Sequence, residues 1–535
     1  MGCADAGMRR GLYVGLFSVA FILLWTLAAA AELRGRVVDE AGQAVVNAYV
    51  TLRSEERPMA ISVLTNGQGQ YVLPDLLEGA YTLQVRRYGY EEATRSVEVG
   101  GDEVVEPVVL ARAGETPELL AGNAVLAALP AEPMKFTFIT GCTICHDMGS
   151  PIAGQPRDFQ GWVDIIEQMR EQNDIYSVIV NFDTAEMARW LVTNRFGESP
   201  LPLDPFATGK PYVTDIQVFE YAVGDAASWA HDMAVEPETG AGWVGDYIND
   251  VLIRIDPETG AQTEYPLPVR HAGMHTLNFD REGRLWFTLQ LTGQVGVFEP
   301  NSGAFKIYDG FGDGALTHSF AYDSEGFVQK DASGRIWVSQ FGNNSLASLD
   351  PETGAVKLYR LGGEKGRPYG IALSSDGRLW YTKYAENLMG VLDPDTGKVK
   401  EWPLPRPDSG PHRMHIDDHD RLWIPLSGYG SLLRYDIQSG TSREYLLPDA
   451  DTFPYAARYD GPTNTVWVNG NGANALYRLD LDSETFDVIR LPSPVSYTRM
   501  VSMDHRRNAV WTALSSYPNG HALRDHGVVV RIVLP

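Results

Sequence analysis

The sequence predicts a mainly β protein: a seven-bladed β-propeller preceded by a small β-sandwich and a short α-helical segment. Three observations support this fold class. The 535 residues include 53 Gly and 32 Pro, a turn-rich composition. Short stretches of alternating apolar and polar residues lie between Gly-rich turns, as in strands with one buried face. A tryptophan recurs with a nearly constant spacing of 43, 51, 43, 43, 44 and 44 residues, which is typical of propeller blades. These are Trp243, Trp286, Trp337, Trp380, Trp423, Trp467 and Trp511.

Composition excludes several classes of function. The chain has 44 Lys and Arg against 69 Asp and Glu, a formal charge of −25. This charge argues against nucleic acid as a partner and against docking on an anionic membrane surface. Three cysteines in 535 residues exclude a disulfide-stabilised scaffold.

The N-terminus is predicted to be a signal peptide, residues 1–31. Arg9 and Arg10 precede an uncharged apolar run from Leu12 to Leu27, and residues 28–31 are four alanines that offer a cleavage site. The alternative is an uncleaved anchor, because the run is about long enough to span a bilayer. No other stretch has that character. We therefore expect a periplasmic or secreted protein without an integral span after cleavage, or one anchored at its N-terminus.

Residues 32–112 are predicted to form the β-sandwich. The stretch Gly79–Val85 has the period-two pattern of a half-buried strand, and residues 65–73 read as a turn followed by a strand. These residues, with Gly89-Tyr90, resemble the carboxypeptidase regulatory-like, or transthyretin-like, domain. The resemblance implies a non-catalytic spacer or docking module.

Residues 113–134 are predicted to be a linker. The motif that follows the linker is one that can bind a cofactor. Cys142-Thr143-Ile144-Cys145-His146 is C-x-x-C-H, the signature of covalent haem attachment. Two thiols at this spacing add to the haem vinyl groups, and the adjacent histidine is the proximal iron ligand. A zinc site needs further ligands, a thioredoxin-type pair needs a βαβ context, and a simple disulfide leaves His146 unexplained. We therefore predict haem c on Cys142 and Cys145, with His146 on the iron.

Residues 135–200 are predicted to be a short α-helical haem segment. Trp162, Ile165, Ile166 and Met169 have helical spacing within residues 158–172, and Thr184 is expected to cap a second helix. The two helices resemble those of small c-type cytochrome domains fused to larger periplasmic proteins. Met169 is our candidate for the distal iron ligand. Met187, a histidine from the propeller and an open coordination site remain alternatives.

Residues 212–535 are predicted to form the propeller. A hairpin turn of the type D-P-E-T-G lies between the tryptophan strands, for example at Asp256–Gly260 and Asp350–Gly354. The seventh blade lacks an outer strand at the C-terminus, and residues 215–223 are expected to supply it and close the ring. The single 51-residue step indicates an insertion near residues 310–326, a loop that carries His318.

The repeat resembles the virginiamycin B lyase (streptogramin lyase) family of propellers. The similar segments are Pro368-Tyr369-Gly370-Ile371 with Trp380-Tyr381-Thr382, and Pro411-His412-Arg413-Met414. The resemblance implies elimination on a cyclic depsipeptide ester with magnesium, and His231 and His275 match its consecutive histidines. The acidic residues that accompany them in the family correspond to Gly273 and Leu289 here. The sequence therefore lacks the carboxylates that would bind magnesium in this family, and it shows no obvious general base for the elimination.

One position can be compared between blades, 11 or 12 residues before each tryptophan. Such positions begin the innermost strands and converge on one mouth of the channel. A cluster of His, Tyr and Arg there is a candidate ligand or metal site, although these side chains also suit simple capping of strands by water. The candidates are His231, His275, Tyr369, His412, Tyr455 and Arg499.

Three functions compete at this point. The favoured one is an exported c-type haem protein that transfers electrons or belongs to a periplasmic oxidoreductase, with a redox partner protein or a small-molecule substrate. The alternatives are a virginiamycin B lyase-like carbon–oxygen lyase and a non-catalytic binding or scaffold protein.

Overall fold

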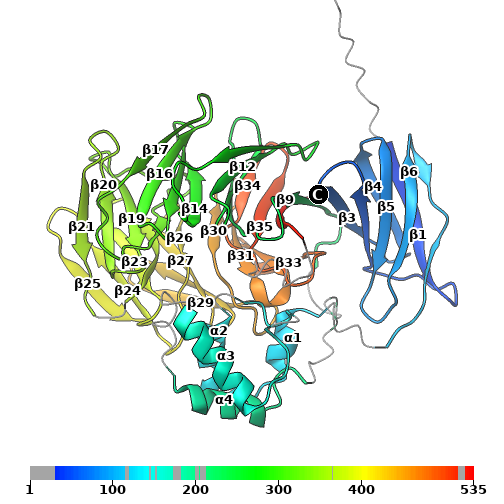
Figure 1. Cartoon of the computed structure of the whole chain (residues 1–535), viewed down its shortest axis with the longest axis horizontal. Coiled ribbons are helices and arrows are strands. Elements are labelled where there is room, and N and C mark those ends of the chain that lie inside the picture. The colour runs from blue at the N-terminus through cyan, green and yellow to red at the C-terminus, as the bar shows by residue number, and fades with distance from the viewer. Residues whose placement is uncertain are drawn as a thin grey trace, which may run out of the picture.

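The computed structural model describes residues 31–114, 120–143, 146–150, 153–172, 182–198, 204, 206, 212–363, 366–515 and 525–535. The propeller carries the sandwich on its rim and the helices on one of its faces (Figure 1). The predicted signal peptide, except for its last residue, and Cys145 lie outside the described residues. No helix among the residues described is both long and apolar enough to cross a bilayer.

The sandwich consists of two sheets around an apolar core. Strand β5 shows why: its alternate residues Tyr81, Leu83 and Val85 are buried, as the period-two pattern predicted. One sheet contains β1 (Ala31–Asp39), β4 (Gln70–Leu76), β7 (Glu103–Val104) and β8 (Val108–Leu110). The other contains β2 (Tyr49–Ser54), β3 (Met59–Leu64), β5 (Gly79–Arg86) and β6 (Ala93–Val99).

The propeller has seven antiparallel blades of four strands, each written here from the channel outward. Blade 1 is β10 (Ala230–Val235), β11 (Gly242–Asp246), β12 (Val251–Ile255) and β13 (Gln262–Pro266). Blade 2 is β14 (Met274–Phe279), β15 (Leu285–Leu289), β16 (Gln294–Glu299) and β17 (Ala304–Tyr308). Blade 3 is β18 (Thr317–Phe320), β19 (Ile336–Gln340), β20 (Ser345–Leu349) and β21 (Val356–Arg360). Blade 4 is β22 (Pro368–Leu373), β23 (Leu379–Lys383), β24 (Leu388–Leu392) and β25 (Val399–Pro403).

The last three blades complete the ring. Blade 5 is β26 (His415–Ile416), β27 (Arg421–Leu426), β28 (Ser431–Asp436) and β29 (Ser442–Leu446). Blade 6 is β30 (Ala457–Asp460), β31 (Thr465–Gly470), β32 (Ala475–Asp480) and β33 (Thr485–Arg490), with the 3₁₀ turn η2 (Asn471–Ala473). Blade 7 is β34 (Ser502–Asp504), β35 (Ala509–Leu514), β36 (Gly527–Val533) and β9 (Gln217–Val223).

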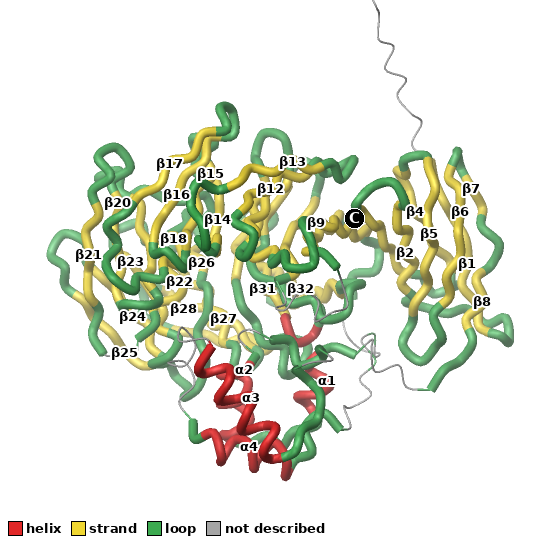
Figure 2. The backbone as a smooth tube through the Cα atoms, viewed as in Figure 1, coloured by secondary structure: helices red, strands yellow, loops and turns green. Residues whose placement is uncertain are grey.

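Strand β9 closes the propeller and also joins it to the sandwich. It pairs antiparallel with β36, so the expected outer strand from residues 215–223 is confirmed. Its other edge pairs with β3 of the sandwich, from Met59 opposite Tyr221 to Ser62 opposite Val218. One sheet of eight strands therefore runs from the channel through blade 7 into the sandwich (Figure 2). This shared sheet leaves β9 with no exposed edge.

Three of the recurring tryptophans are anchored by the same trio of Asp, Arg and Trp. In blade 5, Asp417 accepts hydrogen bonds from the indole of Trp423 at 2.8 Å and from Arg421 Nε at 2.6 Å. The Arg421 guanidinium lies over the indole, 5.9 Å from its centre. The same trios occur around Trp286 and Trp337. The Arg-aliphatic-Trp sequence that these three blades share therefore marks a hydrogen-bonded corner between the first two strands of each.

Replacing Asp417 by Asn is expected to lower the free energy of unfolding by about 3 kcal/mol, because the carboxylate is buried and paired. Equilibrium denaturation measures the change. Asp395→Asn, at an exposed hairpin position, is the control and should change stability by less than about 0.5 kcal/mol. Equal effects of the two substitutions would contradict a structural role for the trio.

The chain between the sandwich and the propeller forms the helical module, whose described residues include four helices: α1 (Gly122–Ala127), α2 (Pro133–Cys142), α3 (Phe159–Gln172) and α4 (Thr184–Thr193). Trp162 and Ile166 of α3 are buried against Met187 and Leu191 of α4, as the helical spacing predicted. Asp183 caps α4 by accepting a hydrogen bond from the backbone of Glu186 at 2.7 Å.

Two details of this module differ from the sequence interpretation. The expected cap Thr184 is instead the first residue of α4, and its hydroxyl hydrogen-bonds to Glu167 and Arg170 of α3. Asp183 has the same capping chemistry one residue earlier. The stretch 113–134 is also not simply a linker, because α1 lies within it and is buried on the propeller. Six small and apolar residues contain too little periodicity to reveal such a helix.

Candidate functional site

The six predicted positions converge, together with His318, on one mouth of the channel; we call these seven side chains the channel ring. Neighbouring ring centroids are 4.1 Å apart for His231 and His275, and 4.2 Å for His275 and His318. The other separations are 4.1 Å from His318 to Tyr369, 4.8 Å from Tyr369 to His412 and 4.7 Å from His412 to Tyr455. Arg499 completes the ring over Tyr455 at 4.5 Å.

His318 is the ring residue that the spacing rule missed. Blade 3 carries its additional residues between β18 and β19, after the ring position, so His318 lies 19 residues before Trp337. The expected insertion at residues 310–326 was therefore placed too early. His318-Ser319-Phe320 matches His275-Thr276-Leu277 of blade 2 in residue type, and this similarity was the available signal.

Hydroxyl groups connect blades 2, 3 and 4 each to the ring residue of the next blade. Thr288 donates to the carbonyl of His318 at 3.0 Å, Ser339 to that of Tyr369 at 2.9 Å and Thr382 to that of His412 at 3.1 Å. Each of these hydroxyls lies two residues after a repeat tryptophan. These three bonds therefore hold the backbone of His318, Tyr369 and His412 against the preceding blades.

The four histidines of the ring are buried. Burial, reinforced by nearby cationic groups, lowers the pKa of His231, His275, His318 and His412 well below the ordinary value. The hydroxyls of Tyr369 and Tyr455 are hydrogen-bonded at 2.8 Å, and burial raises the pKa of Tyr369.

These shifts predict acid sensitivity. His415 is buried with a lowered pKa as well, so below pH 6.5 the unfolded chain takes up protons at five histidines that the folded chain leaves neutral. The contribution of these histidines to the free energy of unfolding should be complete above pH 6.5. It should fall on acidification by up to about 1.4 kcal/mol per pH unit for each histidine. Asp147, whose pKa burial raises to about 7, has the opposite effect and offsets about one histidine.

Urea denaturation between pH 7 and pH 5 measures this slope. Replacing His231 and His318 by Gln should make the slope shallower. A free energy of unfolding that does not change over this pH range would contradict the claim that the buried histidines stay neutral in the folded chain.

An arginine crosses the channel below the ring, a feature that sequence reasoning missed. Arg413 extends from blade 5 to form a buried ion pair with Asp232 of blade 1. Its second nitrogen lies 3.0 Å from Thr276 Oγ1 and 3.2 Å from His275 Nδ1 of blade 2. Burial opposes its charge, but the carboxylate of Asp232 keeps the pKa of Arg413 above its usual value. Asp232 is therefore a partner of Arg413 and is not free to act as a base.

A second layer of aromatic side chains, the aromatic collar, lies next to the channel ring. Tyr384 and Phe453 lie 4.6 and 5.2 Å from His412, and Phe341 lies 5.7 Å from His318. All six collar residues are buried. The collar consists of Trp229, Tyr247, Phe341, Tyr384, Phe453 and Tyr497.

The collar holds the end of α2, where the C-x-x-C-H motif begins. Tyr384 donates a hydrogen bond to the carbonyl of Thr140 at 2.6 Å, and Tyr497 donates one to the carbonyl of Thr143 at 2.7 Å. Cys142 lies between these two carbonyls. Lys135, earlier in α2, forms an ion pair with Asp451 of the propeller at 2.9 Å. The helical module is therefore docked over the channel ring.

Of the three residues predicted to bind a haem, Cys142 and His146 are described. Cys142 packs against the apolar cluster that contains Met148 and Met187, and His146 is half-buried. Met169 is half-buried on α3 and is not among the described side chains packed against that cluster. Within the described parts of the chain, no three His, Cys, Asp or Glu side chains are grouped to hold a metal ion by themselves.

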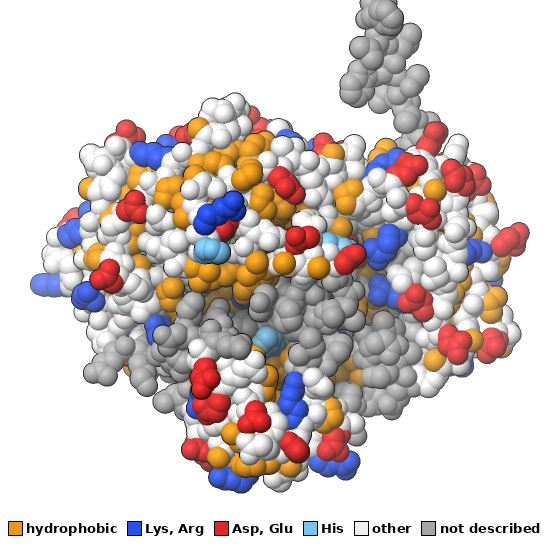
Figure 3. All heavy atoms as spheres, in the orientation of Figure 1, with side chains coloured by type: hydrophobic (Ala, Val, Ile, Leu, Met, Phe, Trp, Pro, Cys, Tyr) orange, Lys and Arg blue, Asp and Glu red, His pale blue; other side chains and the backbone are white. Residues whose placement is uncertain are grey.

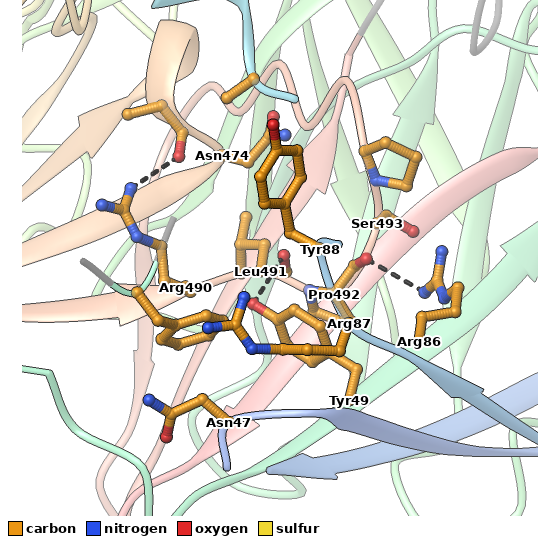
Figure 4. A pocket seen from close by; sticks show the side chains of 14 residues that line it. Asn47, Tyr49, Arg86, Arg87, Tyr88, Asn474, Arg490, Leu491, Pro492 and Ser493 are labelled. Atoms are coloured by element: carbon orange, nitrogen blue, oxygen red, sulfur yellow. Dashed lines mark hydrogen bonds between the residues drawn. The ribbon is translucent and has the colours of Figure 1, made fainter. Parts of the chain in front are cut away.

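A small pocket of about 50 Å³ lies where the sandwich meets blade 6 (Figure 4). Its arginines are engaged: Arg87 bonds to Asp204 at 2.9 Å through two nitrogens, Arg490 pairs with Asp449, and Arg86 donates to the carbonyl of Pro492. Tyr49 also donates across the boundary, to Leu491. These contacts connect the sandwich to the propeller at the pocket.

Charged side chains do not form a patch of one sign on the face in Figure 3, where acidic and basic side chains are interspersed.

Comparison with known proteins gives two family matches. The virginiamycin B lyase family matches residues 326–515, and the carboxypeptidase regulatory-like domain matches residues 32–111. A search among curated proteins finds no significant match.

Solved structures match the propeller. Virginiamycin B lyase from Staphylococcus aureus is 20% identical, with a TM-score of 0.52, over 60% of this chain and 100% of its own. A streptogramin B lyase structure is 21% identical, with a TM-score of 0.51, over 60% of this chain and 98% of its own. A catalytically inactive variant of the S. aureus enzyme with quinupristin matches as the first does. At this identity the likeness shows the fold alone. The chain thus combines a propeller of the virginiamycin B lyase fold with a carboxypeptidase regulatory-like domain.

Proposed function

We propose that this chain is an exported c-type haem protein whose propeller holds a haem-bearing helical module over its histidine-lined mouth. Its role is electron transfer, alone or as part of a periplasmic oxidoreductase. The observation that carries the proposal is the docking of the C-x-x-C-H segment: Tyr384 and Tyr497 hold the carbonyls on either side of Cys142. A propeller that only bound a partner elsewhere would not need this motif at its channel mouth.

The surroundings of Cys142 fit a haem. The thiol is at the end of a helix and packs against a buried cluster that includes Phe138, Ile139 and Met148. Cys142 and Cys145 would hold the haem through thioethers, and His146 would be the proximal ligand. When bound, the haem supplies a one-electron carrier. The apolar and aromatic side chains exclude water from it, and such burial tunes the reduction potential.

The lyase alternative has less support. Gly273 and Leu289 flank His275 in the fold, and neither carries a carboxylate. The carboxylate closest to these histidines in sequence is Asp232, which pairs with Arg413. A role in binding or scaffolding is the second candidate, because the propeller and the sandwich share one continuous sheet.

The test is the absorption spectrum of the full chain produced with the c-type haem maturation machinery, oxidised and then reduced with dithionite. We expect a c-type spectrum whose haem remains with the protein after acid–acetone extraction. A protein without haem would overturn the redox proposal and leave the binding role.

A further inference from the structure

His412 is distinguished from the other histidines of the channel ring. It is fully buried, and among the described residues neither of its ring nitrogens has a hydrogen-bond partner. The other three each have at least one: His231 Nδ1 lies 2.7 Å from the carbonyl of His275, His275 Nδ1 lies 3.0 Å from Thr276 Oγ1, and His318 Nδ1 lies 2.9 Å from Ser319 Oγ. A buried polar group without a partner is unfavourable, and such a group commonly indicates a ligand.

His412 is also the ring histidine next to the docked helix. Its ring lies 4.6 Å from that of Tyr384, which bonds to Thr140, and 5.2 Å from that of Phe453. Phe453 in turn contacts Tyr497, which bonds to Thr143. Two residues before His412, a Cβ on Gly410 would lie only 3.0 Å from Thr140 Cγ2. Three separate contacts therefore bring the segment that carries Cys142 to the neighbourhood of His412.

We propose that His412 supplies the second axial ligand of the haem from the propeller, opposite His146. The assignment rests on the proposed function, because it requires a haem on the helical module. It accounts for the unpartnered imidazole and for the position of the module at this part of the mouth. A neutral imidazole has a lone pair that can bind iron. In this assignment His412 takes the place of Met169 as the distal ligand, because Met169 is not among the described side chains packed against the apolar cluster next to Cys142.

With this assignment, coordination of the iron links the helical module to the propeller. His146 belongs to the helical module and His412 to blade 5, so iron bound to both joins them. Loss of His412 should therefore leave the haem covalently attached and change its spin state, its access to small ligands and its reduction potential.

The experiment compares the matured full chain with H412A, H412M, M169A and the control H318A, a ring histidine that has a hydrogen-bond partner. Pyridine haemochrome assays give haem content, and optical and electron paramagnetic resonance spectra give coordination. We expect a low-spin wild type without the far-red band of a methionine ligand, and high-spin H412A that imidazole restores to low spin. Ferrous H412A should bind CO almost fully, and wild type hardly at all. H412M should acquire the far-red band, whereas M169A and H318A should match wild type.

Three results would overturn the assignment alone: a far-red methionine band in the wild type, a high-spin iron in the wild type, or an H412A spectrum identical to wild type at equal haem content. The wild-type spectrum decides even if H412A does not fold. Matured wild type without covalent haem would instead defeat the proposed function, and the assignment with it.

Discussion

Replacing Arg413 by Met will lower the free energy of unfolding by about 4 kcal/mol, the largest stability effect that we expect from a single change in the propeller. The substitution removes the cation that pairs with Asp232, a carboxylate fully buried in the channel. It also removes the donor to Thr276 Oγ1. A buried charge left without a partner costs more than the pair itself contributes, so the loss should exceed that of any surface ion pair.

The double variant with Asp232→Asn and Arg413→Met separates pairing from packing. Removing both charges should recover at least about 2 kcal/mol of the loss, as a double-mutant cycle in chemical denaturation will show. Arg360→Met, at an exposed position, is the matched control and should leave stability within about 0.5 kcal/mol of wild type. An R413M protein as stable as this control would show that the channel pair is not structural.

Replacing both Cys142 and Cys145 by Ala will abolish covalent haem, the largest functional effect that we expect. Each thioether needs its own sulfur, and the motif contains both cysteines that remain after residue 31. Haem staining of the denatured protein measures the loss. Cys142→Ala alone should leave a single, weaker attachment.

The third cysteine provides the matched control. Cys3→Ala lies in the predicted signal peptide and should leave haem content unchanged. Covalent haem that persists in the double alanine variant would refute attachment at this motif.

The repeat explains why much of the fold was predictable. The tryptophan spacing reflects the turn that each blade makes between its first two strands, and in blades 2, 3 and 5 an Asp-Arg-Trp trio holds that turn. The spacing also located six ring residues, because the distance from the channel mouth to that corner is set by strand length. The need to close the ring predicted β9.

The rest depends on contacts between distant parts of the chain. His318 was missed because an insertion within one blade changed a local distance. The pair of Arg413 and Asp232 joins residues 181 positions apart, and no local pattern shows that the Arg413 side chain enters the channel. Docking of α2 depends on two tyrosine hydroxyls more than 240 residues away in sequence, and each tyrosine alone looks like an ordinary core residue.

The central claim is that a haem is covalently bound at the C-x-x-C-H motif on the mouth of the propeller. Mass spectrometry of a tryptic digest of the matured full chain tests it most directly, because cleavage after Lys135 and Arg157 releases the whole motif as one peptide, residues 136–157. The account predicts that this peptide carries the added mass of one haem. Recovery of the peptide at its unmodified mass, or with Cys142 and Cys145 joined as a disulfide, would contradict it.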